Sequence, residues 1–305
     1  MEIKPGKIER DHLHILLRIA RDEDLGPGDV TGALLPGKAQ AAGRFVAREE
    51  LVACGAAFLP EIGALYDSAI RTEVHVEEGE AVTPGATLAT WSGPARELLA
   101  AERVALNFLQ HLSGVATNAR RFVRTVEGTS AAVYDTRKTT PGWRDLDKYA
   151  VRAGGGRNHR HGLYDAVLVK DNHLALLAGA DDADAIGRLA GLLEQARSRL
   201  ADGGFIEVEV DTLDQFAAAL KLPVEVILLD NMTPEQMRRA VAMRDDAGLK
   251  GKVALEASGG VTLDSVRGIA ETGVERIAVG AITHSAPAVD IGFDLDVSAG
   301  GEGPS

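Results

Sequence analysis

Hydrophobic and polar positions in the first third of the chain follow a mixed pattern. An amphipathic stretch over 8–21 has helical spacing, and partial alternation over 42–48 and 70–76 predicts two strands. An Ala- and Leu-rich helix is expected between them, at about 54–67. Short apolar runs broken by turn residues over 74–93 predict further short strands. This part of the chain is therefore expected to form an α/β domain.

A long helix is expected to begin after Gly93 and Pro94, with one apolar face and Arg103 among its polar residues. From about residue 116 the pattern changes to repeated units of one strand followed by one helix. Six apolar runs predict the strands, at 131–134, 166–169, 205–210, 224–229, 252–255 and 276–279, and helical stretches include 212–220, 233–244 and 262–271. Such alternation predicts parallel pairing with right-handed crossovers.

An open doubly wound sheet and a β/α barrel both satisfy this rule, but the residues that follow the strands favour the barrel. Charged residues and glycines occur at these positions: Arg137, Lys138, Lys170, Glu209, Asp230, Ser258, Gly259, Gly260 and Gly280. In a barrel the C-terminal strand ends converge on one mouth, where the active site lies. Because only six units are visible, we expect a short or incomplete β/α barrel over 116–287, preceded by a first domain over 1–115. The tail, 288–305, is expected to pack back on the first domain.

Composition narrows the class of protein. The 305 residues are 45 % hydrophobic and 26 % charged, which is ordinary for a soluble globular chain of about two domains. No apolar run reaches the ~18 residues of a membrane helix, and the polar N-terminus does not resemble a secretion signal. The single cysteine, Cys54, excludes an internal disulfide, fits the reducing cytoplasm and is expected to be an inert buried thiol.

The net charge of −12 argues against binding to nucleic acid, yet one segment has the opposite sign. Between Arg137 and Lys170 there are eight Lys or Arg and only three acidic residues. This stretch is either a solvated surface patch or a pocket for a small, highly anionic ligand.

Glycines after the last two predicted strands suit a phosphate group, although they could also serve only as tight turns. Ser258, Gly259 and Gly260 lie between a strand and a helix, and Gly280 follows the next strand. Adjacent loops at this place form a recurrent phosphate site in β/α barrels. Sequences typical of dinucleotide-binding and Walker A loops are absent.

Other candidate residues have more than one interpretation. Arg137, His159 and Arg160 could form forks around planar carboxylates. Glu209 and Asp230 are either counter-ions of the basic segment or ligands of sugar hydroxyls, with Mg²⁺ as an intermediary. A zinc site at His159 and His161 is disfavoured because no further ligand is evident. Lys170 could be a Schiff-base nucleophile or a protonated anion ligand.

Taken together, these segments resemble the quinolinate phosphoribosyltransferase family, the carboxylating nicotinate-nucleotide pyrophosphorylases. The matching segments are EDLGPGDVT (23–31), AERVALNFLQHLSGVAT (101–117), DTRKTTPGW (135–143), AGGGRNHRHGL (153–163), AVLVKDNH (166–173), VILLDN (226–231), ALEASGGV (254–261) and VGAITHSAP (279–287). They span nearly the whole chain in the family's order.

The resemblance implies an N-terminal α/β sandwich domain joined to an open, incomplete β/α barrel. It implies transfer of a phosphoribosyl group from phosphoribosyl pyrophosphate to quinolinate. The products would be nicotinate mononucleotide, pyrophosphate and CO₂, in NAD biosynthesis. It also implies Mg²⁺ as cofactor, and a homodimer or assembly of dimers with shared active sites, in which Arg103 enters from the neighbouring subunit. The residues implied at quinolinate are Arg103, Arg137, His159, Arg160 and Lys170. Those implied at phosphoribosyl pyrophosphate are Lys138, Glu209, Asp230, Ser258, Gly259, Gly260 and Gly280.

Three alternatives remain open at this stage. A nicotinate-type phosphoribosyltransferase or a molybdenum-associated relative could share the barrel motifs. A Schiff-base aldolase would use Lys170 as its nucleophile. A carrier module is the non-enzymatic alternative, because 74–93 faintly resembles a lipoyl-type hairpin, but this segment holds no lysine to modify.

Overall fold

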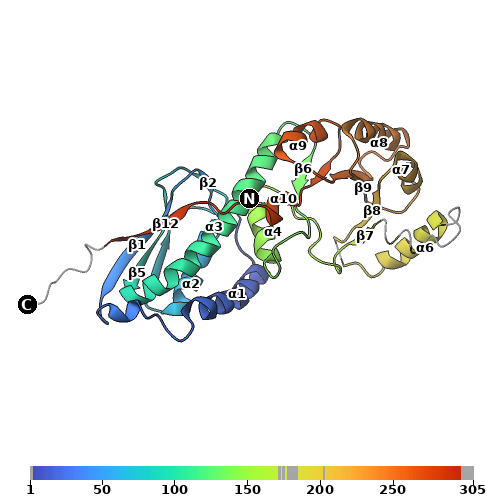
Figure 1. Ribbon diagram of the computed structural model, residues 1–305. Helices are drawn as coiled ribbons and strands as arrows, with labels where there is room; N and C mark the ends of the chain where they lie inside the picture. Colours follow the sequence, from blue (N-terminus) through green and yellow to red (C-terminus); the bar gives the residue numbers. More distant parts are fainter. Residues whose placement is uncertain (1–2, 171–172, 174–175, 177–184, 202, 297–305) are drawn as a thin grey trace, which may run out of the picture. The chain divides into compact units, whose positions relative to one another are not determined.

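The computed structural model describes residues 3–170, 173, 176, 185–201 and 203–296, and it divides into two compact units (Figure 1). Unit 1 comprises Met1–Arg120, Thr139–Gly155 and Ile282–Ser305, and unit 2 comprises Arg121–Lys138 and Gly156–Ala281. The chain therefore passes from one unit to the other four times. The first passage lies inside the long helix α3 (Ala95–Thr125).

Unit 1 is built on a four-stranded antiparallel sheet in the order β12-β1-β5-β3. Its strands are β12 (Ile291–Asp296), β1 (Gln40–Ala47), β5 (Thr87–Pro94) and β3 (Arg71–Val74), and β2 (Leu51–Val52) pairs separately with β4 (Ala81–Val82). The helices of this unit include α1 (Lys7–Leu25), α2 (Leu59–Tyr66) and α4 (Arg144–Ala153), with 3₁₀ turns η1 (Gly32–Leu34) and η2 (Ala56–Phe58). The strand at the end of the chain thus completes the first sheet.

An aromatic cluster forms the core of this sheet. The ring of Phe45 lies 4.9 Å from that of Trp91 and 4.8 Å from that of Phe293, and both Phe45 and Trp91 are fully buried. Gly43, two residues before Phe45 on the same strand, leaves room for the Phe293 ring, because a Cβ atom there would collide with it. Alternate positions of a strand share one face, so Gly43 and Phe45 lie on the same side of the sheet.

Unit 2 is a six-stranded parallel sheet in the order β6-β11-β10-β9-β8-β7. The strands are β6 (Ala132–Tyr134), β11 (Arg276–Ala278), β10 (Ala254–Ser258), β9 (Val226–Asp230), β8 (Ile206–Val210) and β7 (Val167–Val169). β6 and β7 form the two edges and are not paired with each other. This arrangement confirms the predicted open β/α barrel.

The helices of unit 2 are α6 (Ala185–Arg197), α7 (Leu213–Ala219), α8 (Pro234–Asp246) and α9 (Leu263–Ala270), followed by the short α10 (Ala281–His284) at the passage into unit 1. Three of them, α7, α8 and α9, begin at a threonine cap. Thr212, Thr233 and Thr262 each accept the backbone N–H of the residue three positions on, at the start of α7, α8 and α9. Figure 1 shows these three helices along the outside of the sheet. Among the described residues, no helix is both long and apolar enough to cross a bilayer.

Strand register brings the polar residues of the sheet onto one face. Glu209 pairs with Leu228, Leu228 with Glu256, and Glu256 with Arg276, on four successive strands. Because paired residues point to the same side and the period of a strand is two, the residues two positions away share this face. The shared face carries Leu168, Glu207, Glu209, Leu228, Asp230, Glu256, Ser258, Arg276 and Ala278, and most of these side chains line the site described next.

Candidate active site

A cavity of about 550 Å³ lies at the C-terminal ends of the strands of unit 2. Its lining residues are Thr136, Arg137, Lys138, His159, Arg160, Leu168, Lys170, Glu209, Leu228, Asp230, Asn231, Glu256, Ser258, Gly259, Gly260 and Ala278. All the site residues that the sequence predicts are among them except Arg103 and Gly280. Arg103 is an exposed residue of α3 in unit 1, and Gly280 is a half-buried residue after β11.

A buried carboxylate, Asp135, holds together the two loops that supply most of the cations. Its Oδ1 accepts the backbone N–H of His159 at 2.8 Å, and its Oδ2 accepts the side-chain amide of Asn158 at 2.6 Å. Just before these residues, Arg157 forms a parallel bridge with Tyr134 at the end of β6. The loop after β6 and the segment around His159 are therefore fixed to each other by the fold.

The guanidinium group of Arg137 lies close enough to that of Arg160 to disfavour the charge of Arg160. Burial, and then the charge of Arg137, lower the pKa of Arg160. Arg160 is only 9 % exposed and donates from Nη1 to the carbonyl oxygen of Ala166 at 3.2 Å. Like charges held together in a partly buried site are relieved by an anion, so this wall of the cavity is suited to carboxylates.

The carboxylates of Glu209 and Asp230 also line the cavity. Lys170 donates to Glu209 in an ion pair, and Asp230 accepts the side-chain amide of the adjacent Asn231 at 2.6 Å. This pairing makes Lys170 a cation at the cavity mouth, which suits anion binding better than a Schiff base. Asn231 has a positive φ of 51°, the only such non-glycine among the described residues.

The glycine turn after β10 is shaped by a close approach to Asn231. Gly259 has a φ of +97°, and a Cβ atom there would lie 2.6 Å from Cγ of Asn231 and 2.9 Å from its backbone nitrogen. Only glycine fits this position. The turn leads into Thr262, the N-cap residue of α9. It therefore combines a close approach of the backbone with a helix N-terminus. Both features suit a phosphate group.

A charged cluster of four residues adjoins the cavity: His159 and, on β10, Glu256, which both line it, with Glu207 on β8 and Arg276 on β11. His159 Nε2 lies 2.9 Å from Glu207 Oε2, and Arg276 Nε donates to Glu256 Oε2 at 2.5 Å. Sequence reasoning did not select Glu207 or Arg276 as functional. The signal that could have found Glu207 is its place two residues before Glu209 in the otherwise apolar strand IEVEV, which puts both acids on one face.

One group of the described residues has metal-ligand spacing, namely His159, Glu207 and Glu256, whose ligand atoms lie within 4.8 Å of one another. The guanidinium of Arg276 already neutralises Glu256 in this cluster, which disfavours a second cation. His161 is not part of the group. Glu209 and Asp230 at the cavity mouth are better placed for Mg²⁺, because this ion is commonly held by one or two carboxylates together with substrate phosphates.

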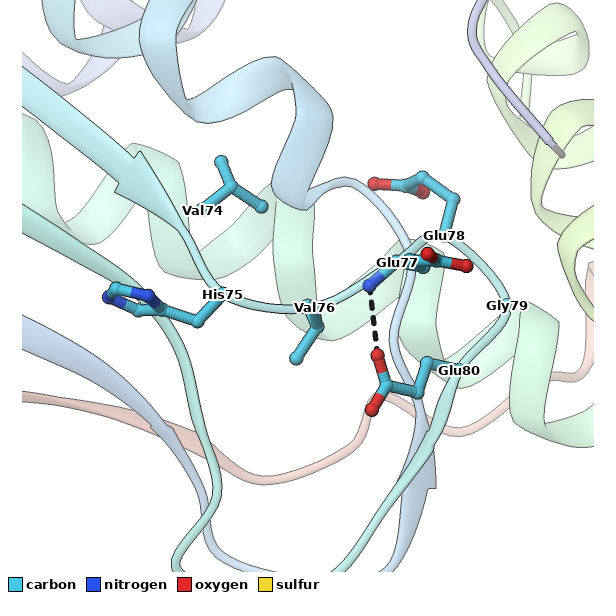
Figure 2. A pocket seen from close by; sticks show the side chains of 7 residues that line it. All are labelled: Val74, His75, Val76, Glu77, Glu78, Gly79 and Glu80. Carbon is cyan, nitrogen blue, oxygen red and sulfur yellow. Dashed lines mark hydrogen bonds between the residues drawn. The ribbon is translucent and has the colours of Figure 1, made fainter.

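A second hollow, of about 620 Å³, lies in unit 1 and is lined by residues 74–80 (Figure 2). Two of its acidic side chains accept backbone N–H groups of the chain. Glu78 accepts the backbone N–H groups of Gly55 and Ala57, both at 2.8 Å, and Glu80 accepts that of Glu77 at 2.9 Å. An acidic lining has the wrong sign for phosphates and carboxylates, so the candidate site is the cavity in unit 2.

The basic segment 137–170 does not act as one surface. Arg137, Lys138, Arg160 and Lys170 line the cavity, but Arg144, Lys148 and Arg152 lie on α4 in unit 1. There Lys148 is fully buried, Arg144 donates to Thr139, and Arg152 pairs with Glu9 at 2.5 Å. The interpretation of the whole segment as one anion pocket is therefore wrong for α4. The pattern in the sequence could not show that the chain leaves unit 2 between 139 and 155.

Known proteins are similar to this chain in sequence and in fold. Residues 29–113 match the family "Quinolinate phosphoribosyl transferase, N-terminal domain", and residues 115–294 match "Quinolinate phosphoribosyl transferase, C-terminal domain". The chain belongs to the quinolinate phosphoribosyltransferase family. It is 42 % identical to a Mycobacterium leprae nicotinate-nucleotide pyrophosphorylase (carboxylating), over 94 % of this chain and 98 % of the relative.

Other quinolinate phosphoribosyltransferase relatives show the same extent of similarity. A Bacillus subtilis protein named probable nicotinate-nucleotide pyrophosphorylase (carboxylating) is 39 % identical over 90 % of this chain and 91 % of its own length. The solved structure of the nicotinate-nucleotide pyrophosphorylase from Francisella tularensis has a TM-score of 0.84 at 34 % identity, covering 97 % of this chain and 99 % of that one. The family likeness therefore extends over both units.

Proposed function

We propose that this enzyme transfers the phosphoribosyl group of phosphoribosyl pyrophosphate to the ring nitrogen of quinolinate. Decarboxylation follows, and the products are nicotinate mononucleotide, pyrophosphate and CO₂, a step of NAD biosynthesis. The observation that carries the proposal is the cavity of unit 2, in which four cations converge beside three carboxylates in a chain of this family. The two substrates together bring two carboxylates, a phosphate and a pyrophosphate, so one pocket must balance many negative charges.

The residues of the cavity divide between the two substrates. We assign Arg137, His159, Arg160 and Lys170 to the carboxylates of quinolinate, because Arg137 and Arg160 form the wall of closely spaced cations. We assign the phosphoribosyl group to the rest of the cavity, with Glu209 and Asp230 at the ribose hydroxyls. The remaining contacts to phosphate and pyrophosphate are assigned to Lys138, Ser258, Gly259, Gly260 and, on the next loop, Gly280.

Catalysis by these groups consists of positioning and charge stabilisation. Attack of the ring nitrogen on the anomeric carbon expels pyrophosphate through an oxocarbenium-like state, and the cavity holds the two reactants in line. Once the nitrogen is ribosylated, CO₂ leaves and the electron pair of the broken C–C bond stays on the ring carbon beside the positively charged nitrogen. A proton taken up from water at this carbon completes nicotinate mononucleotide. The substrate ring is thus its own electron sink, and the chain needs no covalent nucleophile.

We propose Mg²⁺ as the metal of this reaction, held by Glu209 or Asp230 together with the pyrophosphate. Both carboxylates line the cavity, and hard oxygen donors of this kind are the ligands that Mg²⁺ prefers. The ion would supply neutralisation of the pyrophosphate charge. The protein's own contribution is to hold Glu209 against Lys170 and Asp230 against Asn231, so that the two carboxylates keep their places.

The decisive experiment is incubation with carboxyl-labelled quinolinate and phosphoribosyl pyrophosphate, with and without Mg²⁺. We expect labelled CO₂ and pyrophosphate in equal amounts, in the presence of Mg²⁺ only. A nicotinate-type phosphoribosyltransferase would release pyrophosphate from phosphoribosyl pyrophosphate when given nicotinate, and no CO₂ when given quinolinate. Turnover that is unaffected by a chelator would contradict the role of the metal alone.

We further propose a homodimer, or an assembly of dimers, in which Arg103 completes the site of the neighbouring subunit. The support is that Arg103 is exposed on α3 and does not line the cavity to which the family resemblance assigns it. Arg103→Ala and Arg137→Ala are each expected to be inactive. Mixing and reassembling equal amounts of the two variants should restore activity to about one quarter of the sites, because each mixed dimer carries one intact site. Activity measured before and after mixing tests this, and no recovery would show that Arg103 acts within its own subunit.

We place the enzyme in the cytoplasm, in keeping with its single cysteine. Cys54 is buried, which confirms the expected environment of this thiol. Burial, followed by the nearby carboxylate of Glu78, raises the pKa of the Cys54 thiol, so the thiolate is disfavoured. The residue is therefore a packing group that a reducing compartment leaves unchanged.

A further inference from the structure

Asp147, in the first turn of α4, is a buried carboxylate of unit 1 that the proposed reaction does not use. Its side chain is 0 % exposed, and each of its two oxygens accepts a hydrogen bond. Oδ1 lies 2.7 Å from Nε2 of His111, and Oδ2 accepts the backbone N–H of Thr140 at 3.2 Å. An ionised carboxylate can only accept, so the His111 ring donates from Nε2. Because a buried charge is tolerated only with such partners, the carboxylate ties helix α3 to the backbone at Thr140.

Aromatic contacts fix the orientation of the His111 ring. The ring of Trp143 stacks on that of Phe108, with the ring centres 4.6 Å apart, and meets the ring of His111 edge to face at 5.0 Å. Phe108 and His111 are three residues apart on α3, so they are neighbours on the surface of this helix. The imidazole is therefore held between a carboxylate and an indole, and only 28 % of it is exposed.

The four residues from Thr140 to Trp143 form a tight turn. The backbone N–H of Trp143 donates to the carbonyl oxygen of Thr140 at 3.0 Å, and Gly142 has a φ of +81°. Proline followed by a glycine with positive φ, as in Pro141 and Gly142, is typical of the two central positions of a type II turn. The N–H of Asp147 then donates to the carbonyl oxygen of Trp143 at 2.9 Å, at the start of α4. His111 and Asp147 thus hold a well-defined piece of chain.

This turn directly follows two residues of the cavity. Arg137 and Lys138 line the cavity in unit 2, and the chain enters unit 1 at Thr139. Asp135, the buried carboxylate directly after β6, anchors the other end of the same segment. The four residues between Asp135 and Thr140 include both cations. These cations are therefore bounded on each side by a backbone position that a buried aspartate fixes.

We propose that Asp147 and His111 are positioning residues for the segment that carries Arg137 and Lys138. Neither lines the cavity as the structure describes it, and both act through the backbone of Thr140. A segment fixed at both ends has few conformations, so its side chains lose little further entropy when they bind a ligand. The role of the two cations in substrate binding rests on the proposed function, whereas the anchoring of the segment does not.

Cleavage by a lysine-specific protease measures the anchoring without any substrate. Lys138 is exposed, and the bond after it leads to Thr139 inside the anchored segment. His111→Leu removes the donor to Asp147 and should raise the rate of cleavage after Lys138 about tenfold, because a protease acts on the locally opened chain. Mass spectrometry of the fragments identifies the bond that is cut.

Two further variants control for a general loss of stability. Gln110, next to His111 on α3, is also half-buried and donates from its side chain at 2.8 Å, but to the carbonyl oxygen of Ile291. Gln110→Leu should therefore leave cleavage after Lys138 as in the wild type. His111→Gln keeps an N–H donor for the carboxylate and should stay within about threefold of the wild type. Unchanged cleavage in His111→Leu, or equally fast cleavage in Gln110→Leu, would overturn the inference.

Kinetics then separate positioning from folding. His111→Leu should raise the KM for quinolinate and that for phosphoribosyl pyrophosphate about fivefold each, with kcat changed less than about twofold, because binding to both cations is weakened. Asp147→Asn, which replaces one acceptor oxygen by a donor, should show the same pattern. Faster cleavage with unchanged KM values would contradict the positioning role. Wild-type protein that releases no CO₂ from quinolinate would refute the proposed function instead, and the cleavage rates would still decide whether the segment is anchored.

Discussion

Replacing Arg160 by alanine should lower kcat/KM for quinolinate about 1000-fold. This factor corresponds to roughly 4 kcal/mol, within the range for truncating one partner of a buried, hydrogen-bonded charge pair. Arg160 lines the cavity, is nearly buried, and shares its wall with Arg137, so its removal leaves one substrate carboxylate without a partner. The loss should appear mainly in the binding of quinolinate.

Folding of this variant should be retained, because the change also removes the unfavourable approach of two guanidinium groups. We expect the free energy of unfolding to stay within ~1 kcal/mol of the wild type, as measured with urea. Arg157→Ala is the matched control. Its side chain is exposed and bonded to Tyr134 outside the cavity, so kcat/KM should change little. Equal losses in the two variants would show that the effect of Arg160→Ala is not specific to the site.

Asp135→Ala should affect both stability and activity. Asp135 is 0 % exposed, and it accepts the backbone N–H of His159 and the side-chain amide of Asn158. Its removal leaves buried donors unmatched, so the free energy of unfolding should fall by roughly 3 kcal/mol. The loop that carries His159 and Arg160 loses its anchor, and kcat/KM should fall by at least about 100-fold, since small misplacements of reacting groups have effects of this size.

Asp67→Ala provides the comparison for this second variant. The Asp67 carboxylate also accepts a backbone N–H, that of Ala69, but this bond is exposed to solvent and lies in unit 1. We expect a loss of stability below ~1 kcal/mol and normal turnover, by urea unfolding and the CO₂ assay. An Asp135→Ala variant that is destabilised yet fully active would show that the anchor serves folding alone.

Much of the fold follows from the sequence because the period of the apolar residues changes along the chain. The six runs between 131 and 279 correspond to β6–β11, and the three polar stretches after the last strands correspond to α7, α8 and α9. The same argument predicts most of the charged residues and glycines that line the cavity. Residues directly after parallel strands must gather at one end of the sheet, whichever residues they are.

What could not be predicted depends on contacts between distant segments. Helix α4 is charged at half of its positions, yet Asp147 and Lys148 on it are fully buried, because unit 1 supplies partners such as His111 at 2.7 Å from Asp147. No local pattern shows such a partner. Glu207 and Arg276 lie within short apolar strands, where a charged residue resembles a strand end until the register shows that it faces inward.

The position of β12 has a consequence for how the protein is made. This strand pairs along most of β1, about 250 residues earlier in the chain, with Phe293 opposite Phe45. While the ribosome is still translating the middle of the message, the first sheet lacks an edge, whereas every strand of unit 2 emerges before residue 281. Because the chain is synthesised from its N-terminus, unit 2 should be able to fold before the sheet of unit 1 is complete. The aromatic core beside β1 should therefore stay exposed to chaperones until β12 has been synthesised.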